Sequence, residues 1–300
     1  MSRILVTGAN GYIGRHVVSA LLDLGYEVVA TDIRLDGVDS RATGVISDIF
    51  SEPAPFVAFG QPDTVIHLAW RDGFIHQSPA HLQDLPLHYA FLRRMIESGV
   101  GSVSVMGSMH EIGFYEGMVD ENTPANPASL YGIAKNALRQ ALTALNTTAP
   151  FSLHWLRAYY ILGDDRRNHS VFAKLLEKAA AGETVFPFTT GTNRYDFIHI
   201  DDLALEIALA SVQTESNGVI NCCSGRAVAL KDVVEDFIAK NRLPIRLQYG
   251  AFPDRPYDSR VIYGSADRIR GILSRAKPEL RGEVADRVSR LLAILPQKGA

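Results

Sequence analysis

Short apolar runs alternate with helical patterns through the first half of the 300-residue chain. The strand-like runs are mostly apolar and occupy residues 4–6, 28–30, 45–46, 64–66, 103–105 and 152–155. Between them, apolar residues at helical spacing predict helices over residues 12–24, 80–98 and 129–146. Strands that alternate with helices form parallel sheets, and parallel strands are buried on both faces. The pattern therefore predicts an α/β fold with a doubly wound parallel sheet.

The pattern changes after about residue 157. Loops become longer and contain proline, and further helices are predicted over residues 170–181, 201–213, 229–240 and 280–294. We therefore expect a first domain of residues 1–157 and a smaller C-terminal lobe of residues 158–300, with some segments of the lobe returning to the first domain. A cleft between two such parts is a common ligand site.

Composition and charge exclude several classes of protein. Hydrophobic residues make up 47% and charged residues 21%, which excludes a disordered, collagen-like or coiled-coil chain. The net charge of −3 lacks the cationic excess that favours nucleic acid or an anionic membrane surface. No apolar run reaches the roughly 18 residues of a membrane span, and the N-terminus does not resemble a signal peptide. Because Cys222 and Cys223 are the only cysteines, we expect no metal site, no disulfides and a reducing, cytoplasmic location.

A glycine-rich turn follows the first predicted strand. Gly8, Gly11 and Gly14 have the spacing G-x-x-G-x-x-G and lead into the first predicted helix. Gly8 allows a tight turn, Gly11 lets a pyrophosphate approach the backbone, and Gly14 lets the helix pack closely on the strand. The N–H groups of Tyr12 and Ile13 lie at the start of the helix, where an anion is favoured. The turn predicts a Rossmann-like dinucleotide site.

Acidic residues after the next two strands bear on the choice of dinucleotide. Asp32 follows the second strand, where a carboxylate accepts both ribose hydroxyls of NAD and repels the 2′-phosphate of NADP. Arg34 would favour NADP, which stays an alternative, but the position of Asp32 favours NAD. Asp48 and Ile49 follow the third strand and are candidates for the adenine edge. A loop-capping role for Asp48 fits equally well.

A tyrosine and a lysine at the start of the 129–146 helix carry the candidate chemistry. Tyr131 and Lys135 are four residues apart and share one helix face. An ammonium beside a phenol lowers the phenol's pKa, which makes Tyr131 a candidate acid and base for a hydroxyl or carbonyl oxygen. Ser108 ends the strand at 103–106 and can orient that oxygen beside Tyr131. Together with the glycine turn, these residues predict an oxidoreductase.

The combined motifs resemble the extended short-chain dehydrogenase/reductase family, and within it the branch of nucleotide-sugar epimerases, dehydratases and 4-ketoreductases. The matching motifs cover nearly the whole chain and lie at Thr7 to Gly14, His67 to Trp70, Ser108, Tyr131 to Lys135, Leu156 and Arg157, Arg194 to Asp202, Asn221 to Gly225, and Arg255 to Asp258.

This resemblance implies roles for individual residues. Ser108, Tyr131 and Lys135 would be the catalytic triad, with Tyr131 moving the proton, Lys135 holding the nicotinamide ribose and Ser108 contacting the sugar oxygen. Further contacts to the cofactor are implied for Leu68, Ala69, Trp70, Tyr131, Lys135 and Ala158. Contacts to a nucleotide-diphosphate sugar are implied for Trp70, Ser108, Met109, His110, Tyr131, Tyr160, Ser170, Phe186, Arg194, Arg255 and Asp258.

Some of these substrate contacts have alternatives, and the resemblance also implies an assembly. Arg194 and Arg255 match the diphosphate-binding arginines, since guanidinium forks fit phosphate oxygens, although surface pairing is an alternative. Phe186 or Phe188 would stack on the base, although two core phenylalanines fit equally well. The helices at 80–98 and 129–146 would pair with a second copy as a four-helix bundle, which makes a homodimer.

The chain departs from the family pattern at several positions in the implied sugar pocket. Met109 and His110 stand where dehydratases have an acidic pair, and loss of water needs a positioned acid, so a dehydratase is disfavoured. Tyr160 replaces the usual Asn, and His88 and Phe91 replace the usual Asn and Gly. Trp70 replaces the last alanine of the usual H-L-A-A motif. His110 is either a sugar contact and proton donor or a solvated loop histidine.

We therefore predict NAD-dependent hydride transfer at C4 of a nucleotide-activated sugar, by a 4-ketoreductase or dehydrogenase of, for example, a dTDP- or GDP-6-deoxyhexose. A 4-epimerase would use the same groups and retain its cofactor, but the bulky Tyr160 argues against rotation of a keto-sugar. A non-catalytic NAD sensor is a further alternative. A sensor would not need the intact set of Ser108, Tyr131 and Lys135.

Overall fold

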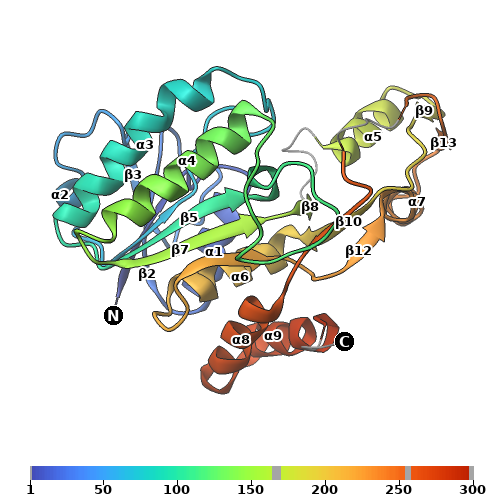
Figure 1. The fold of residues 1–300 in the computed structure, drawn as a ribbon. Helices are drawn as coiled ribbons and strands as arrows, with labels where there is room; N and C mark the ends of the chain where they lie inside the picture. Colours follow the sequence, from blue (N-terminus) through green and yellow to red (C-terminus); the bar gives the residue numbers. More distant parts are fainter. Residues whose placement is uncertain (1, 164–169, 254–257, 297–300) are drawn as a thin grey trace.

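A seven-stranded parallel sheet forms the centre of the computed structural model, which describes residues 2–163, 170–253 and 258–296 (Figure 1). Its strand order is β3-β2-β1-β4-β5-β7-β11, and every neighbouring pair is parallel. The strands are β1 (Arg3–Thr7), β2 (Glu27–Asp32), β3 (Thr43–Ile46), β4 (Thr64–His67), β5 (Ser102–Ser108), β7 (Ser152–Ala158) and β11 (Gly218–Cys222). The predicted doubly wound parallel sheet is confirmed.

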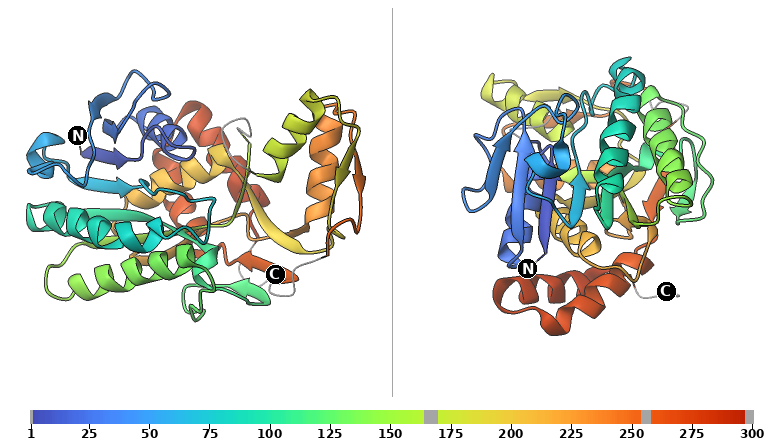
Figure 2. Two further views of the ribbon diagram at one scale, coloured as in Figure 1. Left: turned by 90° about the horizontal axis from the view of Figure 1, so that it is seen from above. Right: turned by 90° about the vertical axis from the view of Figure 1, so that its left-hand side faces the viewer.

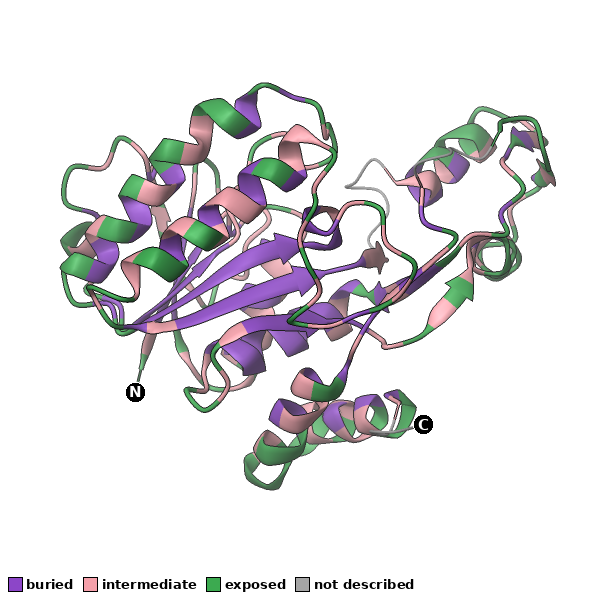
Figure 3. Ribbon diagram, in the orientation of Figure 1, coloured by how far each residue is buried: buried purple, intermediate pink, exposed green. Residues whose placement is uncertain are grey.

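Helices cover both faces of this sheet (Figure 2). One face packs on α2 (Pro55–Ala58), α3 (Ala80–Glu97) and α4 (Leu130–Leu145), and the other on α1 (Gly14–Asp23) and α6 (Ile200–Ser211). Side chains alternate along β1, so Leu5 joins the α3–α4 core, whereas Ile4 and Val6 join the α1–α6 core. Figure 3 shows the central strands of this sheet as almost continuously buried, which explains their apolar sequences, whereas the edge strand β3 is largely exposed.

The remaining helices include one that the pattern did not predict. α5 (Val171–Ala180), α7 (Leu230–Lys240) and α9 (Gly282–Ile294) lie where the sequence predicted helices. α1 begins at Gly14 rather than at residue 12, because residues 8–13 form the glycine-rich turn. α8 (Asp267–Ala276) was missed, although its buried Ile269, Ile272 and Leu273 have helical spacing, because charged residues dominate the segment.

The smaller lobe contains segments from both halves of the chain. One sheet has the order β12-β10-β14-β6, with β8 also pairing with β10, and a second sheet pairs β13 with β9. These strands are β6 (Gly117–Val119), β8 (Tyr160–Leu162), β9 (Val185–Pro187), β10 (Arg194–His199), β12 (Ala227–Ala229), β13 (Arg246–Gln248) and β14 (Val261–Gly264). β6 enters the lobe from the first half, while β11 and α6 return to the main sheet. The domain division at residue 157 stays a prediction.

Two further findings concern the described residues as a whole. None of their helices combines the length and the apolar character that crossing a membrane requires. Their His, Cys, Asp and Glu side chains also form no group of three or more that is arranged to hold a metal ion.

Candidate active site

A cavity of about 860 Å³ lies at the carboxyl ends of the main-sheet strands. The glycine turn, the ends of β2, β4 and β5, and the start of α4 line one side. Residues of β8, α5 and β10 in the smaller lobe line the other. Ligands of open parallel sheets bind at this edge, because the loops that follow the strands meet there. The cavity is therefore the candidate site for both cofactor and substrate.

The glycine turn has the close backbone approaches that a dinucleotide site needs. Gly8 has φ +67°, and a Cβ there would lie 2.5 Å from the backbone nitrogen of Ala69. A Cβ on Gly14 would collide with the carbonyl oxygen of Gly8. The N-cap of α1, Ile13, supplies no side-chain acceptor, so the first turn of the helix is suited to a pyrophosphate. Gly8, Gly11, Tyr12, Ile13 and Gly14 all line the cavity.

The carboxylate of Asp32 lies beside this turn at the end of β2. It accepts the backbone N–H groups of Asn10 at 3.0 Å and Ile33 at 2.7 Å, and it lines the cavity. This position suits the two ribose hydroxyls of NAD. Arg34 is exposed and does not line the cavity. Asp48 both lines the cavity and accepts the N–H of Phe50, so the two roles considered for it are compatible.

Ser108, Tyr131 and Lys135 meet at one end of the cavity. Ser108 is the last residue of β5, and the other two residues lie in the first two turns of α4. Burial raises the pKa of the Tyr131 phenol, and the hydrogen bond between the Ser108 hydroxyl and the Tyr131 side chain offsets part of that increase. The Nζ of Lys135 lies 5.8 Å from the centroid of the Tyr131 ring and donates to the Met106 carbonyl at 2.7 Å. The structure thus brings together the three residues that the sequence singled out.

Burial has the largest effect on the pKa values of Tyr131 and Lys135 in the protein without cofactor. It raises the pKa of Tyr131, so the phenol is a proton donor at neutral pH. The sequence predicted instead that Lys135 would lower this pKa. That prediction is wrong for the free protein, because the ammonium faces the Met106 carbonyl and the indole of Trp70. Burial also lowers the pKa of Lys135 to about 7.

Trp70 and His88 both depart from the family pattern, and the Trp70 ring packs between His88 and Lys135. The Trp70 ring stacks on His88 with centroids 4.3 Å apart, and its Nε1 donates to Nδ1 of His81 at 3.0 Å. The His88 imidazole in turn hydrogen-bonds to His67 at 2.8 Å. Burial lowers the pKa of His67 to about 3, so its ring is neutral at physiological pH.

Two further imidazoles lie against Tyr131. The His76 ring is stacked on the phenol ring with centroids 5.3 Å apart, and it lies 4.1 Å from the His110 ring. Burial lowers the pKa of His110 to about 4, and the neighbouring His76 adds to this effect. His110 was predicted and lines the cavity, whereas His76 was missed. His76 lies in the loop after β4, and loops at the carboxyl ends of parallel strands commonly carry site residues.

Some of the substrate contacts that were predicted among residues 158–300 line the cavity, and others do not. Tyr160, Ser170 and Asp258 line the cavity, and Tyr160 packs against Tyr195 and Phe197 with centroids 4.5 and 5.5 Å apart. The remaining predicted cofactor contacts, Ile49, Leu68, Ala69, Trp70 and Ala158, also line it.

Several predicted contacts do not line the cavity. Met109 is buried in the main core. Phe186 and Phe188 are buried with Leu175 and Val234 in the core of the smaller lobe, because β9 packs against α5 and α7. Arg194 is exposed and donates to the Ala227 carbonyl at 2.8 Å. Arg255 lies outside the described residues.

A model of the NAD dependent epimerase/dehydratase family matches residues 4–223. The chain belongs to this family. Its sequence is 44% identical over 270 residues to dTDP-6-deoxy-L-talose 4-dehydrogenase (NAD(+)) of Aggregatibacter actinomycetemcomitans. The aligned region covers 87% of this chain and 99% of that protein. It is 26% identical over 315 residues to UDP-glucose 4-epimerase of Neisseria meningitidis serogroup B, which covers 88% of this chain and 89% of that protein.

Solved structures show the same fold. The UDP-N-acetylglucosamine 4-epimerase from Methanobrevibacter ruminantium M1, in complex with UDP-N-acetylmuramic acid, superposes with a TM-score of 0.80. The match covers 98% of this chain and 97% of that one at 19% identity. The resemblance to the extended short-chain family is confirmed. This member of the family is an NAD-dependent enzyme, and the hypothesis of a non-catalytic sensor is set aside.

Proposed function

We propose that the protein is an NAD-dependent nucleotide-sugar 4-ketoreductase or dehydrogenase that acts on a dTDP-linked 6-deoxyhexose. The observation that carries the proposal is the meeting of Ser108, Tyr131 and Lys135 in a cavity that also contains the glycine turn and Asp32. The 44% identity to a dTDP-6-deoxy-L-talose 4-dehydrogenase supports the choice of nucleotide, sugar class and carbon atom.

The chain's own residues supply proton transfer and positioning. Nicotinamide, when bound, supplies or accepts the hydride. Ser108 orients the C4 oxygen of the sugar beside Tyr131, which gives that oxygen a proton on reduction and takes it back on oxidation. The raised pKa of Tyr131 keeps the phenol protonated at neutral pH, which suits the reducing direction. Asp32 and the glycine turn have the donors and acceptors that fit NAD.

A dehydratase is disfavoured by the side chains around Ser108. Elimination of water requires an acid beside the leaving hydroxyl. His110 stays neutral above about pH 4, and Met109 is in the core. Glu111 does not line the cavity, and its carboxylate accepts hydrogen bonds from the Ser108 N–H and from Trp155. None of these three residues supplies that acid.

The test is turnover of NADH with a panel of nucleotide-linked 4-keto-6-deoxy sugars, followed by chromatography of each mixture. We expect loss of nicotinamide absorbance in proportion to the formation of a new dTDP-sugar. Unchanged absorbance together with interconversion of UDP- or GDP-hexose epimers would overturn the proposal in favour of a 4-epimerase. The 26% identity to a UDP-glucose 4-epimerase supports that second candidate. The aromatic packing of Tyr160 against Tyr195 in the cavity argues against it, because it restricts rotation of a keto-sugar.

We also propose a homodimer through a four-helix bundle of α3 and α4, and a cytoplasmic location. The two helices pack side by side (Figure 1), and Leu82, Leu87 and Ile133 are between 41% and 44% exposed on them. Light scattering should give twice the chain mass for the wild type and a lower mass for Leu87→Glu combined with Ile133→Glu. A monomeric wild type would contradict the dimer. Cys222 and Cys223 are free thiols, which suits a reducing compartment, and cell fractionation tests the location.

A further inference from the structure

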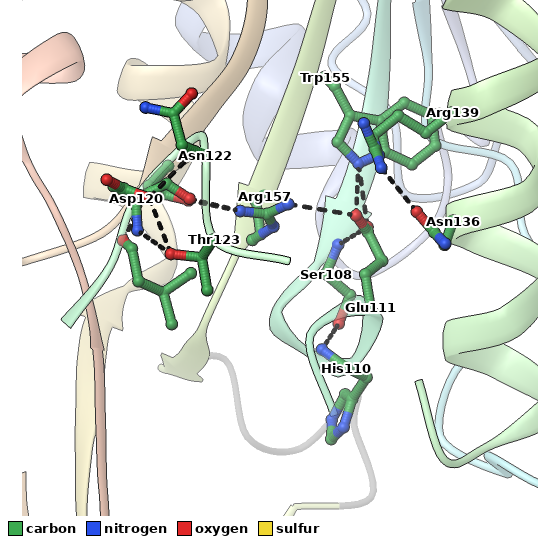
Figure 4. A network of polar contacts seen from close by, with 12 residues as sticks. Ser108, His110, Glu111, Asp120, Asn122, Thr123, Asn136, Arg139, Trp155 and Arg157 are labelled. Atoms are coloured by element: carbon green, nitrogen blue, oxygen red, sulfur yellow. Dashed lines mark hydrogen bonds and ion pairs between the residues drawn. The ribbon is translucent and has the colours of Figure 1, made fainter. Parts of the chain in front are cut away.

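Glu111 is a fully buried acidic residue directly behind the catalytic serine (Figure 4). It ends the short helix η1 (Met109–Glu111), for which Ser108 is the N-cap. Its Oε1 accepts the backbone N–H of Ser108 at 2.6 Å, and its two oxygens accept Nε1–H of Trp155 at 3.0 and 2.8 Å. Arg157 lies on the other side, with Nη2 3.7 Å from Oε2. The carboxylate is therefore fixed by β5 and β7 together.

The surrounding backbone leaves room for this carboxylate. A Cβ on Gly107 would lie 2.7 Å from Oε1 of Glu111 and would collide with Nε1 of Trp155. The groups that contact the two oxygens, namely an amide N–H, an indole N–H and a guanidinium, are all donors. A protonated carboxyl would have to turn its O–H toward one of these donors. This geometry fits an ionised Glu111, although burial raises the pKa of the group.

The charges that face Glu111 come from two elements. Arg157 on β7 and Lys135 on α4 both favour its ionised form. In return, the negative charge of Glu111 opposes the effect of burial on the pKa values of Lys135 and of Arg139, which is also on α4. The same charge raises the pKa values of Tyr131 and Tyr159. Glu111 thus acts electrostatically on two of the three catalytic residues.

We propose that Glu111 is a positioning residue of the reaction, whose buried negative charge favours the protonated forms of Lys135 and Tyr131 while its oxygen fixes the backbone of Ser108. The effect of this Glu111 role on turnover rests on the proposed function, because it concerns the donation of a proton during reduction. A protonated Tyr131 is the form that can donate to the C4 oxygen. A protonated Lys135 is the form that can donate to a ribose hydroxyl.

The first test measures the pKa of Lys135 directly, without cofactor or sugar. The protein is labelled with ¹³C-lysine, the Lys135 resonance is assigned by its loss in Lys135→Met, and it is titrated by NMR. Removing the opposite charge that acts on a buried ammonium shifts its pKa by about 1 unit. We therefore expect the pKa of Lys135 to fall by about 1 unit in Glu111→Gln and to stay near the wild-type value in Glu111→Asp, which keeps the charge.

Glu206→Gln is the matched control for this titration. Glu206 is also fully buried, but it lies on α6, and its charge does not contribute to the pKa shift of Lys135. This variant should leave the pKa of Lys135 unchanged. A Lys135 pKa in Glu111→Gln equal to that of the wild type would overturn the proposal, as would an equal fall in Glu206→Gln. Circular dichroism shows which variants are folded. If Glu111→Gln is not, ¹³C titration of the Glu111 carboxyl in the wild type takes its place, and a carboxyl that is protonated at pH 7 would overturn the proposal.

The second test is the pH profile of NADH-dependent reduction. Loss of the charge lowers both pKa values, so the alkaline limb of kcat/KM should move to lower pH in Glu111→Gln and stay in place in Glu111→Asp. A purely structural role would lower kcat equally at every pH without moving the limb, and that outcome would contradict the proposal. If the wild type fails to reduce any sugar of the panel, the proposed function fails, while the titration of Lys135 still decides the role of Glu111.

Discussion

The ammonium nitrogen of Lys135 lies 3.7 Å from the centroid of the Trp70 ring. The resemblance to the extended short-chain family leads one to expect alanine at position 70, so this cation–π contact is a feature of the present chain. An aromatic face stabilises a cation but does not replace its hydration, and Lys135 is only 2% exposed. Burial therefore dominates, and the pKa of Lys135 falls to about 7 in the free protein.

This burial predicts a pH-dependent stability. The pKa of Lys135 is about 7 when folded against an ordinary value of 10.5, so between these values the unfolded chain binds more protons. The contribution of Lys135 to the free energy of unfolding should therefore rise with pH across this window, by about 1.4 kcal/mol per unit at most, and be constant below pH 7. Urea denaturation of the wild type and Lys135→Met at pH 7 and 9.5 measures the difference. A gap between the two that does not change with pH would contradict the assignment.

Tyr131→Phe should strongly reduce turnover and leave the binding of cofactor nearly unchanged. General acid catalysis contributes about 10²- to 10⁴-fold, so kcat should fall by that factor. The Kd of NADH, measured by fluorescence, should stay within about twofold, because the ring and its stacking remain. Tyr159→Phe is the control, since Tyr159 also lines the cavity but its buried hydroxyl has no hydrogen-bond partner among the described residues. Equal losses of kcat in the two variants would show that Tyr131 is not the proton donor.

Asp32→Asn should weaken the preference for NAD over NADP. The substitution keeps an oxygen for the N–H of Asn10 but removes the charge that repels a 2′-phosphate. A charge-assisted hydrogen bond contributes about 1.5–3 kcal/mol, so the ratio of the Kd for NADP to the Kd for NAD should fall about tenfold or more. Asp39→Asn, whose carboxylate pairs with Arg41 outside the cavity lining, should leave this ratio unchanged. Calorimetry with both dinucleotides gives the ratio, and no change in Asp32→Asn would exclude this role for Asp32.

The main sheet and the meeting of the three candidate catalytic residues were predictable because their signals are local. Apolar runs predict buried parallel strands. The glycine turn is recognised from the spacing of Gly8, Gly11 and Gly14 between a strand and a helix. Tyr131 and Lys135 share a helix face by periodicity, and Ser108 ends a strand of the same sheet. Such features do not depend on how distant elements pack.

The rest of the site depends on packing between distant segments. Phe186 and Phe188 were candidates for the base, yet whether an aromatic residue faces a cavity or a core follows from how α5 and α7 pack on β9. The pKa of Tyr131 depends on where the Lys135 side chain points, which helical spacing leaves open. Glu111 did carry a local signal, because Ser108 to Glu111 reads as the capping box S-x-x-E. The sequence alone did not show that this carboxylate is buried against Trp155 and Arg157.

Substitutions of the glycines in the turn should distinguish effects on folding from effects on cofactor binding. A Cβ on Gly14 would collide with the carbonyl oxygen of Gly8, which is backbone and cannot move aside, so Gly14→Ala should lower the Tm of the protein without cofactor. Overpacking of this kind costs about 1–3 kcal/mol. A Cβ on Gly101 meets nothing within 4 Å, so Gly101→Ala should keep the wild-type Tm. At Gly11 the nearest atom would be the same Gly8 oxygen at 3.0 Å, so Gly11→Ala should lower Tm less than Gly14→Ala does. It should also weaken NADH binding, because its methyl group occupies the approach of the pyrophosphate. Equal Tm values for Gly14→Ala and Gly101→Ala would contradict this account of the turn.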